Sequence, residues 1–369
     1  MARFDPHAYR CKVGSIKYTL PHSNCFKTTQ QPSPKLLKMN HNGFMTNREA
    51  NPQIEDCARR NVPPTSADII RLPARDVPLG GIRDMMVSRT LPQRNLPMVG
   101  AWCFLDEAGP EPHLARILPH PHTALQTVTW PLVGTIRHRD STGAEVVIKP
   151  GQLNLMTAGY GISHSEFSPG DVADDLHLLQ FWVTLPAAQS GPDTPGRFEQ
   201  HLELPLVVHP EAEVTVFMGQ LGEVVSPATV YTPLVGAQVS LAGSGRLSLP
   251  TEPGWEYAVL VIHGAAAVNG HDAVPKELLY LGVDLPSLDF FAHDDDTLLI
   301  LLGGEPFGED VIMWWNFIGR SHEEIVTARE QWEAGSARFG TVAGHGGQRI
   351  PAPPLPNLRL TPRRRKVRH

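Results

Sequence analysis

Two short runs of metal-ligating residues constrain this chain more than any other feature of its sequence. The first is LPHPH, residues 118–122, and the second is ISHSE, residues 162–166. Side chains two residues apart in a β-strand point to the same face, so each run can direct a pair of ligands at one point. The sequence therefore predicts a metal site made by His120, His122, His164 and Glu166. The alternative is that the two prolines mark an irregular turn and leave surface histidines without a metal.

The donor set favours a divalent first-row metal. Three neutral imidazoles and one carboxylate suit an ion of borderline hardness. We expect Fe(2+), because two histidines and a carboxylate on one face leave positions open for dioxygen. Zinc is the main alternative, and other divalent transition metals remain open.

The rest of the chain predicts an all-β protein. Gly and Pro, 32 and 35 residues, are frequent, and short apolar segments recur between turn signals, as in a β-sandwich or barrel. The Asn269-Gly270 pair is typical of a β-hairpin. One helix is expected over 321–335, because Ser321 and Glu324 form a capping box and Gly335 follows.

These patterns divide the chain into four parts. Residues 1–62 show no sustained period and are expected to be a disordered extension. A metal-binding barrel is expected over 68–185, and a second barrel over 198–340 with the 321–335 helix closing it. The residues between the two expected barrels are rich in Pro, Gly, Ser and Asp. Residues 341–369 are expected to be a flexible basic tail.

Composition bears on location and partners. The chain has 32 Lys and Arg against 38 Asp and Glu, a net charge of −6, which disfavours nucleic acid as a direct ligand and anionic membrane as a partner. The sequence contains no run of about 20 apolar residues, the length needed to span a bilayer. No CxxC pair occurs among the four cysteines, Cys11, Cys25, Cys57 and Cys103. We expect a cytoplasmic protein, with the nucleus as the alternative in a eukaryotic host. The basic run 363–368 is expected to be a solvated terminus, with nuclear import or nucleic-acid contact as the alternative.

Three segments then resemble a known family. They are LPHPHTALQTVTWPLVGTIRHRDSTG, KPGQLNLMTAGYGISHSE and LHLLQFWVTLP, and they are similar to the pirin family of the cupin superfamily. The segment beginning LLGGEPFGEDVIMWWNF looks like the end of the pirin C-terminal domain. The resemblance covers about residues 68–340 and implies a bicupin, two cupin-type β-barrels of which one is working and one structural. It places the pirin iron ligands on His120, His122, His164 and Glu166.

The resemblance leaves two functions open. Some pirins are described as quercetin 2,3-dioxygenases, which implies an Fe(II)-dependent dioxygenase acting on flavonols such as quercetin. Others are described as iron-binding nuclear co-regulators, which implies a non-enzymatic, redox-sensing protein that regulates protein partners. A zinc enzyme or a metal-stabilised structural module is the third interpretation.

The chain departs from the pirin pattern at residues 123–126, where Thr-Ala-Leu-Gln replaces the usual Arg-Gly-Phe-Glu. Gln126 has the parity of His120 and His122, so we expect it to face the metal and orient a ligand, with plain packing as the alternative. An amide cannot act as a general base. Glu166 is then the carboxylate expected to act as both ligand and base.

Other polar and aromatic residues are weaker candidates. Tyr160 either caps the pocket or packs beside it, and His138 is expected to be an exposed hairpin residue. Trp314 and Trp315 are expected in an interdomain core. The histidines of the second half lack HxH or HxE spacing and are not expected to bind a second metal: His263, His271 and His293.

Overall fold

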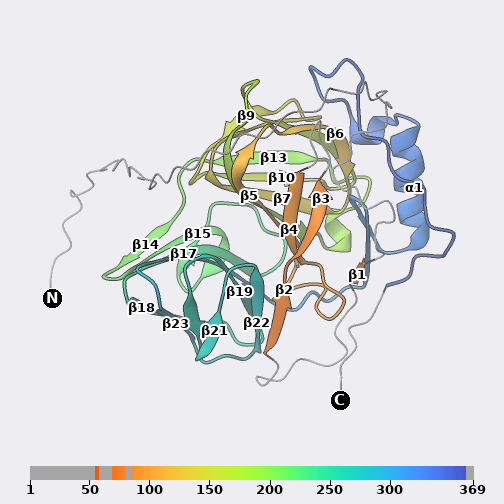
Figure 1. Cartoon of the computed structure of the whole chain (residues 1–369). Helices are drawn as coiled ribbons and strands as arrows, with labels where there is room; N and C mark the ends of the chain where they lie inside the picture. The colour runs from red at the N-terminus through yellow and green to blue at the C-terminus, as the bar shows by residue number, and fades with distance from the viewer. Residues whose placement is uncertain (1–54, 58–68, 80–84, 363–369) are drawn as a thin grey trace, which may run out of the picture. The chain divides into compact units, whose positions relative to one another are not determined.

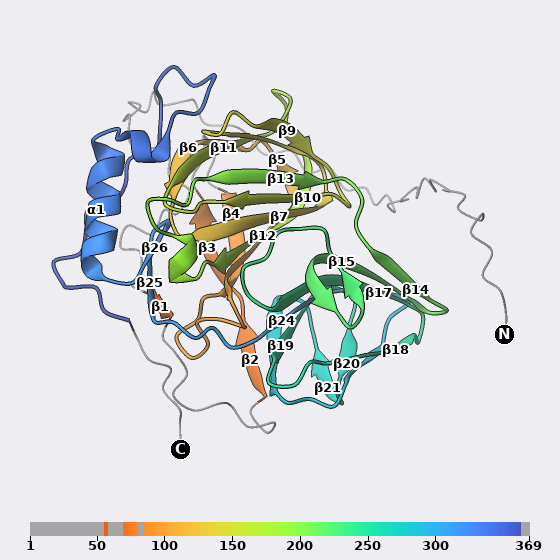
Figure 2. The ribbon, with the colours of Figure 1, turned by 180° about the vertical axis from the view of Figure 1, so that it is seen from behind.

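The computed structural model describes residues 55–57, 69–79 and 85–362, and most of their regular structure is β-sheet (Figures 1 and 2). The prediction of an all-β chain with two barrels and one short C-terminal helix is confirmed. Every pair of named strands is antiparallel, which allows each barrel one packed and one solvent-facing surface.

The first barrel consists of two sheets that face each other. The larger has the order β13-β10-β7-β12-β5-β4-β3 and the smaller has the order β6-β11-β8-β9. The larger sheet contains β3 (Arg75–Leu79), β4 (Met85–Leu91), β5 (Trp102–His113), β7 (Leu125–Val133), β10 (Leu153–Thr157), β12 (Asp174–Thr184) and β13 (Arg197–His201). The smaller sheet contains β6 (Arg116–His122), β8 (Ile136–Asp140), β9 (Glu145–Ile148) and β11 (Ile162–Phe167).

The second barrel repeats this plan. Its larger sheet has the order β14-β15-β17-β24-β19-β22-β2, with β16 paired to β15, and its smaller sheet has the order β18-β23-β20-β21. The larger sheet contains β2 (Ile70–Pro73), β14 (Leu206–His209), β15 (Ala212–Leu221), β16 (Val224–Val225), β17 (Leu234–Ala242), β19 (Glu256–His263), β22 (Glu277–Val283) and β24 (Asp296–Gly304). The smaller sheet contains β18 (Arg246–Leu249), β20 (Ala266–Val268), β21 (His271–Ala273) and β23 (Leu288–Ala292).

After the second barrel the chain returns to the first. A small sheet of order β1-β25-β26 joins β1 (Glu55–Cys57) to β25 (Val311–Trp314) and β26 (Phe317–Gly319). The helix α1 (His322–Glu333) contacts β25 and β26, and β26 in turn contacts β6. Figures 1 and 2 show α1 beside the barrel that contains β6 and β11. Two short 3-10 turns are η1 (Ala187–Gln189) and η2 (Ala337–Phe339).

Strand pairing differs from the domain limits expected from sequence. The strand β2 pairs with β22 and so belongs to the second barrel, although it precedes the first. The strand β13, expected in the second barrel, pairs with β10 of the first. The helix α1, expected to close the second barrel, packs against the first, as does the Trp314-Trp315 pair in the same apolar cluster. Local sequence pattern defines strands but not their partners, because these pairings join residues far apart in the chain.

Local signals predicted several turns correctly. The β20–β21 hairpin has Asn269 and Gly270 at φ values of +50° and +78°, as a type I′ turn requires. The Ser321 side chain accepts a hydrogen bond from the backbone N–H of Glu324 at 3.2 Å and caps α1. The expected hairpin around residues 140–143 joins β8 to β9.

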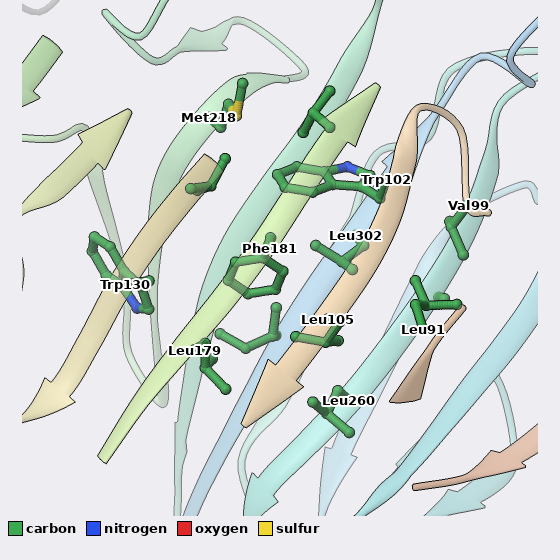
Figure 3. Packing of buried hydrophobic residues seen from close by; sticks show 14 of the residues in the cluster. Leu91, Val99, Trp102, Leu105, Trp130, Leu179, Phe181, Met218, Leu260 and Leu302 are labelled. Carbon is green, nitrogen blue, oxygen red and sulfur yellow. The ribbon is translucent and has the colours of Figure 1, made fainter. Parts of the chain in front are cut away.

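The larger sheets of the two barrels share an apolar core (Figure 3). Trp102 and Phe181 of the first barrel lie edge-on at a centroid separation of 5.5 Å, and Trp102 lies 6.2 Å from Phe217 of the second. The Trp102 indole Nε1–H is shared between the carbonyls of Val235 and Gly303, at 3.1 and 3.2 Å. This core fixes the first barrel, and with it the predicted metal site, to the second.

The expected disorder over 1–62 is wrong for β1, which pairs with β25. The rest of residues 1–62, with Cys11 and Cys25, lies outside the described residues, as does the basic run 363–368. Cys103 is a buried free thiol in the first barrel, as expected of a small core side chain.

Candidate metal centre

Neighbouring strands bring three predicted ligands together. In the pairing of β6 with β11, His164 lies opposite His120, and Ile162 lies opposite His122. The donor nitrogens of the three histidines lie within 4.8 Å of one another, and each residue is 2% exposed. Among the described residues no other group of three His, Cys, Asp or Glu side chains meets in this way. Three of the four predicted ligands, His120, His122 and His164, therefore lie together.

Hydrogen bonds orient two of the three rings. His120 Nδ1 lies 2.9 Å from the Leu118 carbonyl oxygen, so this nitrogen carries the proton and Nε2 is left with a free lone pair. His164 Nδ1 lies 3.4 Å from His138 Nδ1. The Nε2 atoms of His122 and His164 are 3.0 Å apart. His122 and His164 thus face each other through their Nε2 atoms, and a donor nitrogen of His120 lies within 4.8 Å of both rings' donor nitrogens.

The distance between those two nitrogens fits a shared ion. Imidazole nitrogens bind divalent first-row metals at about 2.1 Å, which separates two ligand atoms by about 3.0 Å at a right angle and about 3.4 Å at a tetrahedral angle. The observed 3.0 Å between the Nε2 atoms of His122 and His164 is short enough for both nitrogens to contact one ion.

All three imidazoles are held neutral. Burial lowers the pKa of His120 to about 4, and burial together with the neighbouring imidazoles lowers the pKa of His122 and His164 well below 6.5. Metal binding requires unprotonated imidazole. No imidazolium of the triad therefore has to lose its proton before a metal binds at neutral pH.

Glu166 lines the same cavity as the three histidines but is not one of the mutually close group. A register shift in the β6–β11 pairing falls between His164 and Glu166, where Leu118 and Pro119 face the single residue Ser165. Burial raises the pKa of Glu166 to about 7. A carboxyl of this kind can both hold and accept a proton near neutrality, and its role as the fourth ligand stays a prediction.

The cavity beside the triad is mainly apolar. It encloses about 70 Å³ between the two sheets of the first barrel, with Asn316 of the returning segment in its wall. Its apolar walls include Val87, Phe104, Ala108, Ala115, Ile117, Ile136, Leu176, Leu178 and Trp182. Phe104 stacks on Trp182 at 4.0 Å, and Trp182 lies edge-on to His122 at 5.2 Å.

One buried ion pair also lines the cavity. The Arg89 guanidinium donates two hydrogen bonds to the Asp106 carboxylate, each at 2.7 Å, and it lies 4.5 Å from the centre of the Phe104 ring. Bidentate pairing offsets the cost of burying both charges. Sequence reasoning missed this pair because its members lie on different strands, β4 and β5.

Gln126 does not lie in the cavity. Its side-chain amide donates to the Thr157 hydroxyl at 2.9 Å and to the Thr229 carbonyl at 3.0 Å, and Thr127 lines the cavity instead. The expected position of Gln126 facing the metal is wrong because Ala124, at φ +56°, breaks the strand between His122 and Gln126. A left-handed residue reverses the alternation of side chains between the two faces of a strand.

His138 is also placed differently from the prediction. It is 2% exposed, and its Nε2 lies 2.9 Å from the Asp140 carboxylate while its Nδ1 faces His164. The HxD spacing on one strand was the available signal, since residues 138 and 140 share a face. Tyr160 takes the packing role: Arg338 lies 3.7 Å from the centre of its ring, and Tyr160 is not among the cavity residues.

The segment that follows α1 packs against the first barrel, so the expectation of a flexible tail from residue 341 is wrong for its described part. The Ile350 N–H donates to the Pro119 carbonyl at 2.8 Å, and the Ser163 hydroxyl donates to the Phe339 carbonyl at 2.9 Å. His345 Nε2 lies 2.9 Å from the Ser165 hydroxyl. Residues 337–350 thus bond to β6 through the Pro119 carbonyl and to β11 through the side chains of Ser163 and Ser165.

The second-barrel histidines lie apart from this centre. His263 is 3.4 Å from Asp296 and His293 is 3.4 Å from Asp272, all with largely exposed side chains. No helix among the described residues has the length and apolar character needed to cross a bilayer.

Comparison with known proteins agrees with this architecture. Residues 84–183 match the family model described as pirin, and residues 236–340 match that of the pirin C-terminal cupin domain. A Pseudomonas aeruginosa protein provisionally named quercetin 2,3-dioxygenase is 42% identical over 290 residues, covering 78% of this chain and 90% of that protein. A pirin-like protein of Caulobacter vibrioides is 34% identical over 72% of this chain and 94% of its own length.

A solved structure is similar over both barrels. The crystal structure of a quercetin 2,3-dioxygenase from Acinetobacter baumannii is 38% identical, with a TM-score of 0.74 over 79% of this chain and 96% of that one. The paired family matches, the extent of the relatives and the two-barrel fold with a single histidine cluster in its described part lead to one conclusion. The chain belongs to the pirin family of bicupins.

Proposed function

We propose that this protein is a metal-dependent dioxygenase that acts on flavonols such as quercetin, with Fe(2+) as its metal. The observation that carries the proposal is the group of three neutral, buried imidazoles that opens into an apolar cavity beside Glu166. Two relatives named as quercetin 2,3-dioxygenases support it. His120, His122, His164 and Glu166 are the proposed ligands.

The chain's own residues supply binding and proton transfer. Apolar and aromatic walls favour a flat aromatic substrate, and Trp182 and Phe104 offer ring faces beside the triad. The ion, when bound, would supply Lewis acidity and redox chemistry toward dioxygen. A pKa of about 7 lets Glu166 accept the proton of the flavonol hydroxyl at neutral pH.

The cavity limits how much of the substrate can enter. Its 70 Å³ is well below the roughly 300–1,000 Å³ of pockets that bury whole drug-sized ligands. With the walls in this position, the proposed pose inserts only the reacting part of the flavonol and leaves the rest toward the opening. Exclusion of water from the reacting end protects it from side reactions.

The test is an oxygen and carbon monoxide balance. Protein purified without added metal is loaded with Fe(2+) under anaerobic conditions and then mixed with quercetin and air-saturated buffer. We expect one O2 consumed and one CO released for each quercetin opened. His164→Ala should abolish turnover, whereas His263→Ala, in an exposed pair of the second barrel, should retain it.

Iron-loaded protein that leaves both gases unchanged would overturn the proposal. The alternative from sequence, a redox-sensing regulator of protein partners, would then be the function to test. Its measurement is the affinity for a partner with the metal in its two oxidation states.

A further inference from the structure

A buried chain of hydrogen bonds leads away from one of the proposed ligands. His164 Nδ1 lies 3.4 Å from His138 Nδ1, and His138 Nε2 lies 2.9 Å from Asp140 Oδ2. All three residues are 2% exposed. The His138 ring stacks on Phe198 at 4.5 Å and 20°, so its plane is fixed.

Asp140 is built into the β8–β9 hairpin as a hydrogen-bond acceptor. Its Oδ1 accepts from the Thr142 N–H at 2.8 Å, from the Thr142 hydroxyl at 2.6 Å and from the Ala144 N–H at 3.3 Å. Burial alone would raise the pKa of this carboxyl, but hydrogen bonds from His138 and Thr142 outweigh it and lower the pKa. The ionised Asp140 carboxylate therefore accepts hydrogen bonds through Oδ2 as well as through Oδ1.

The proton positions follow from these partners. An acceptor at Asp140 requires the proton of His138 on Nε2, which leaves a lone pair on His138 Nδ1. That lone pair requires the proton of His164 on Nδ1. His164 Nε2 is then unprotonated, and this is the atom that lies 3.0 Å from His122 Nε2.

We propose that Asp140 and His138 are positioning residues that fix the tautomer of His164 and so hold its Nε2 ready for the metal. The inference rests on the metal site of the proposed function but not on its reaction. Partners beyond the ligands usually orient metal-bound histidines and raise their basicity. The partner of His120 Nδ1 is the uncharged Leu118 carbonyl. His164 differs, because the anionic Asp140 supports its Nδ1 through His138.

Asp140→Asn tests which atoms donate and which accept along the hydrogen bonds from His164 to Asp140. The amide NH2 would face His138 Nε2, which must then accept, so its proton moves to Nδ1. His164 would have to accept at Nδ1 and carry its own proton on Nε2, where the metal should bind. We expect a loss of about 10–100-fold in cobalt(II) affinity, measured by titration of the metal-free protein and by the intensity of the cobalt absorption bands.

Two controls separate this effect from a general weakening of the barrel. Glu107→Gln alters another buried carboxylate–histidine pair of the first barrel, 2.8 Å from His177 and without contact to the triad, and should keep the cobalt(II) affinity of the unaltered protein. Thr142→Val removes one donor to Asp140 but keeps its charge, and should lose much less affinity than Asp140→Asn.

Variants of His138 provide the rescue. His138→Gln keeps an acceptor that can face His164 and a donor that can face Asp140, and should retain more affinity than His138→Phe, which keeps only the ring stacking. Unchanged affinity in Asp140→Asn, or equal losses in Asp140→Asn and Thr142→Val, would overturn the inference. Neither result depends on oxygen uptake, so a failure of the dioxygenase proposal remains distinguishable.

Discussion

Burying a histidine without a charged partner normally costs stability, because its protonated form is lost in the interior. This protein brings the donor nitrogens of three such rings within 4.8 Å of one another. Their mutual proximity lowers the pKa of His122 and His164 further. Imidazoles that resist protonation in this way keep their nitrogens available to bind a metal ion instead of a proton.

His122→Ala should therefore remove most of the metal affinity. One of three converging nitrogens is lost, and we expect a loss of more than about 100-fold, beyond what outer partners contribute. The measurement is metal content after equilibration with one equivalent of cobalt(II), with His263→Ala as the surface control. Equal metal content in the two variants would show that the triad is not the binding site.

The pH dependence of metal binding should report Glu166. Its carboxyl has a pKa of about 7 and must lose its proton to become a ligand, whereas His120 protonates only near pH 4. Affinity should fall about tenfold for each pH unit below 7 and level off above it. Titrations with cobalt(II) at several pH values from about 5 to 8 measure this slope.

Glu166→Gln should bind more weakly but lose the slope between pH 5 and 7. A slope that persists in this variant would assign the proton to another group and would remove Glu166 from the ligand set.

The predictability of individual residues depends on whether the strand between them is continuous. The convergence of His120, His122 and His164 could be predicted from sequence, because the HxH pair and the HxE pair each lie on one strand. Gln126 could not, because the left-handed backbone of Ala124 lies between it and His122. His138 was misjudged because hairpin position suggests exposure, whereas the hairpin folds its inner face onto the triad.

At the scale of elements, strands and turns were predictable but their partners were not. Apolar alternation and turn residues depend on neighbours in sequence. The pairings of β1 with β25, β2 with β22 and β10 with β13 depend on contacts between distant segments. The position of α1 follows from a buried face that could have covered either barrel.

The segment after α1 should support the metal site through packing. Trp332 is 3% exposed, packs edge-on against Phe339 at 5.5 Å and donates to the Ile350 carbonyl at 2.8 Å. Trp332→Ala should cost about 3–5 kcal/mol of unfolding free energy. It should also weaken cobalt(II) binding, because Phe339 accepts from the Ser163 hydroxyl of β11 and Ile350 donates to the Pro119 carbonyl of β6.

Urea unfolding and cobalt(II) titration measure the two effects. Trp255→Ala, a half-buried tryptophan of the second barrel, should leave cobalt(II) affinity unchanged. Retention of full affinity in Trp332→Ala would show that the segment stabilises the fold without acting on the site.

At the scale of the whole described structure, the contact between barrels leaves no room for an added methyl group at Gly236. A Cβ there would lie 2.4 Å from Phe217 and 2.8 Å from Trp102. Gly236→Ala should therefore lower the unfolding free energy by about 1–3 kcal/mol. Gly308→Ala is the matched control, since a Cβ at Gly308 meets no atom within 4 Å. Equal stabilities in urea would show that the two large sheets can separate at little cost.

The return of the chain to its first barrel also sets an order of events during synthesis. The ribosome synthesises β6 and β11 long before residues 337–350, which form hydrogen bonds to those strands. Domains usually fold in the order in which they emerge, but here some contacts of the earlier barrel require residues 337–350, which follow the second barrel in sequence. Loading of the metal should accordingly follow the synthesis of residues 337–350.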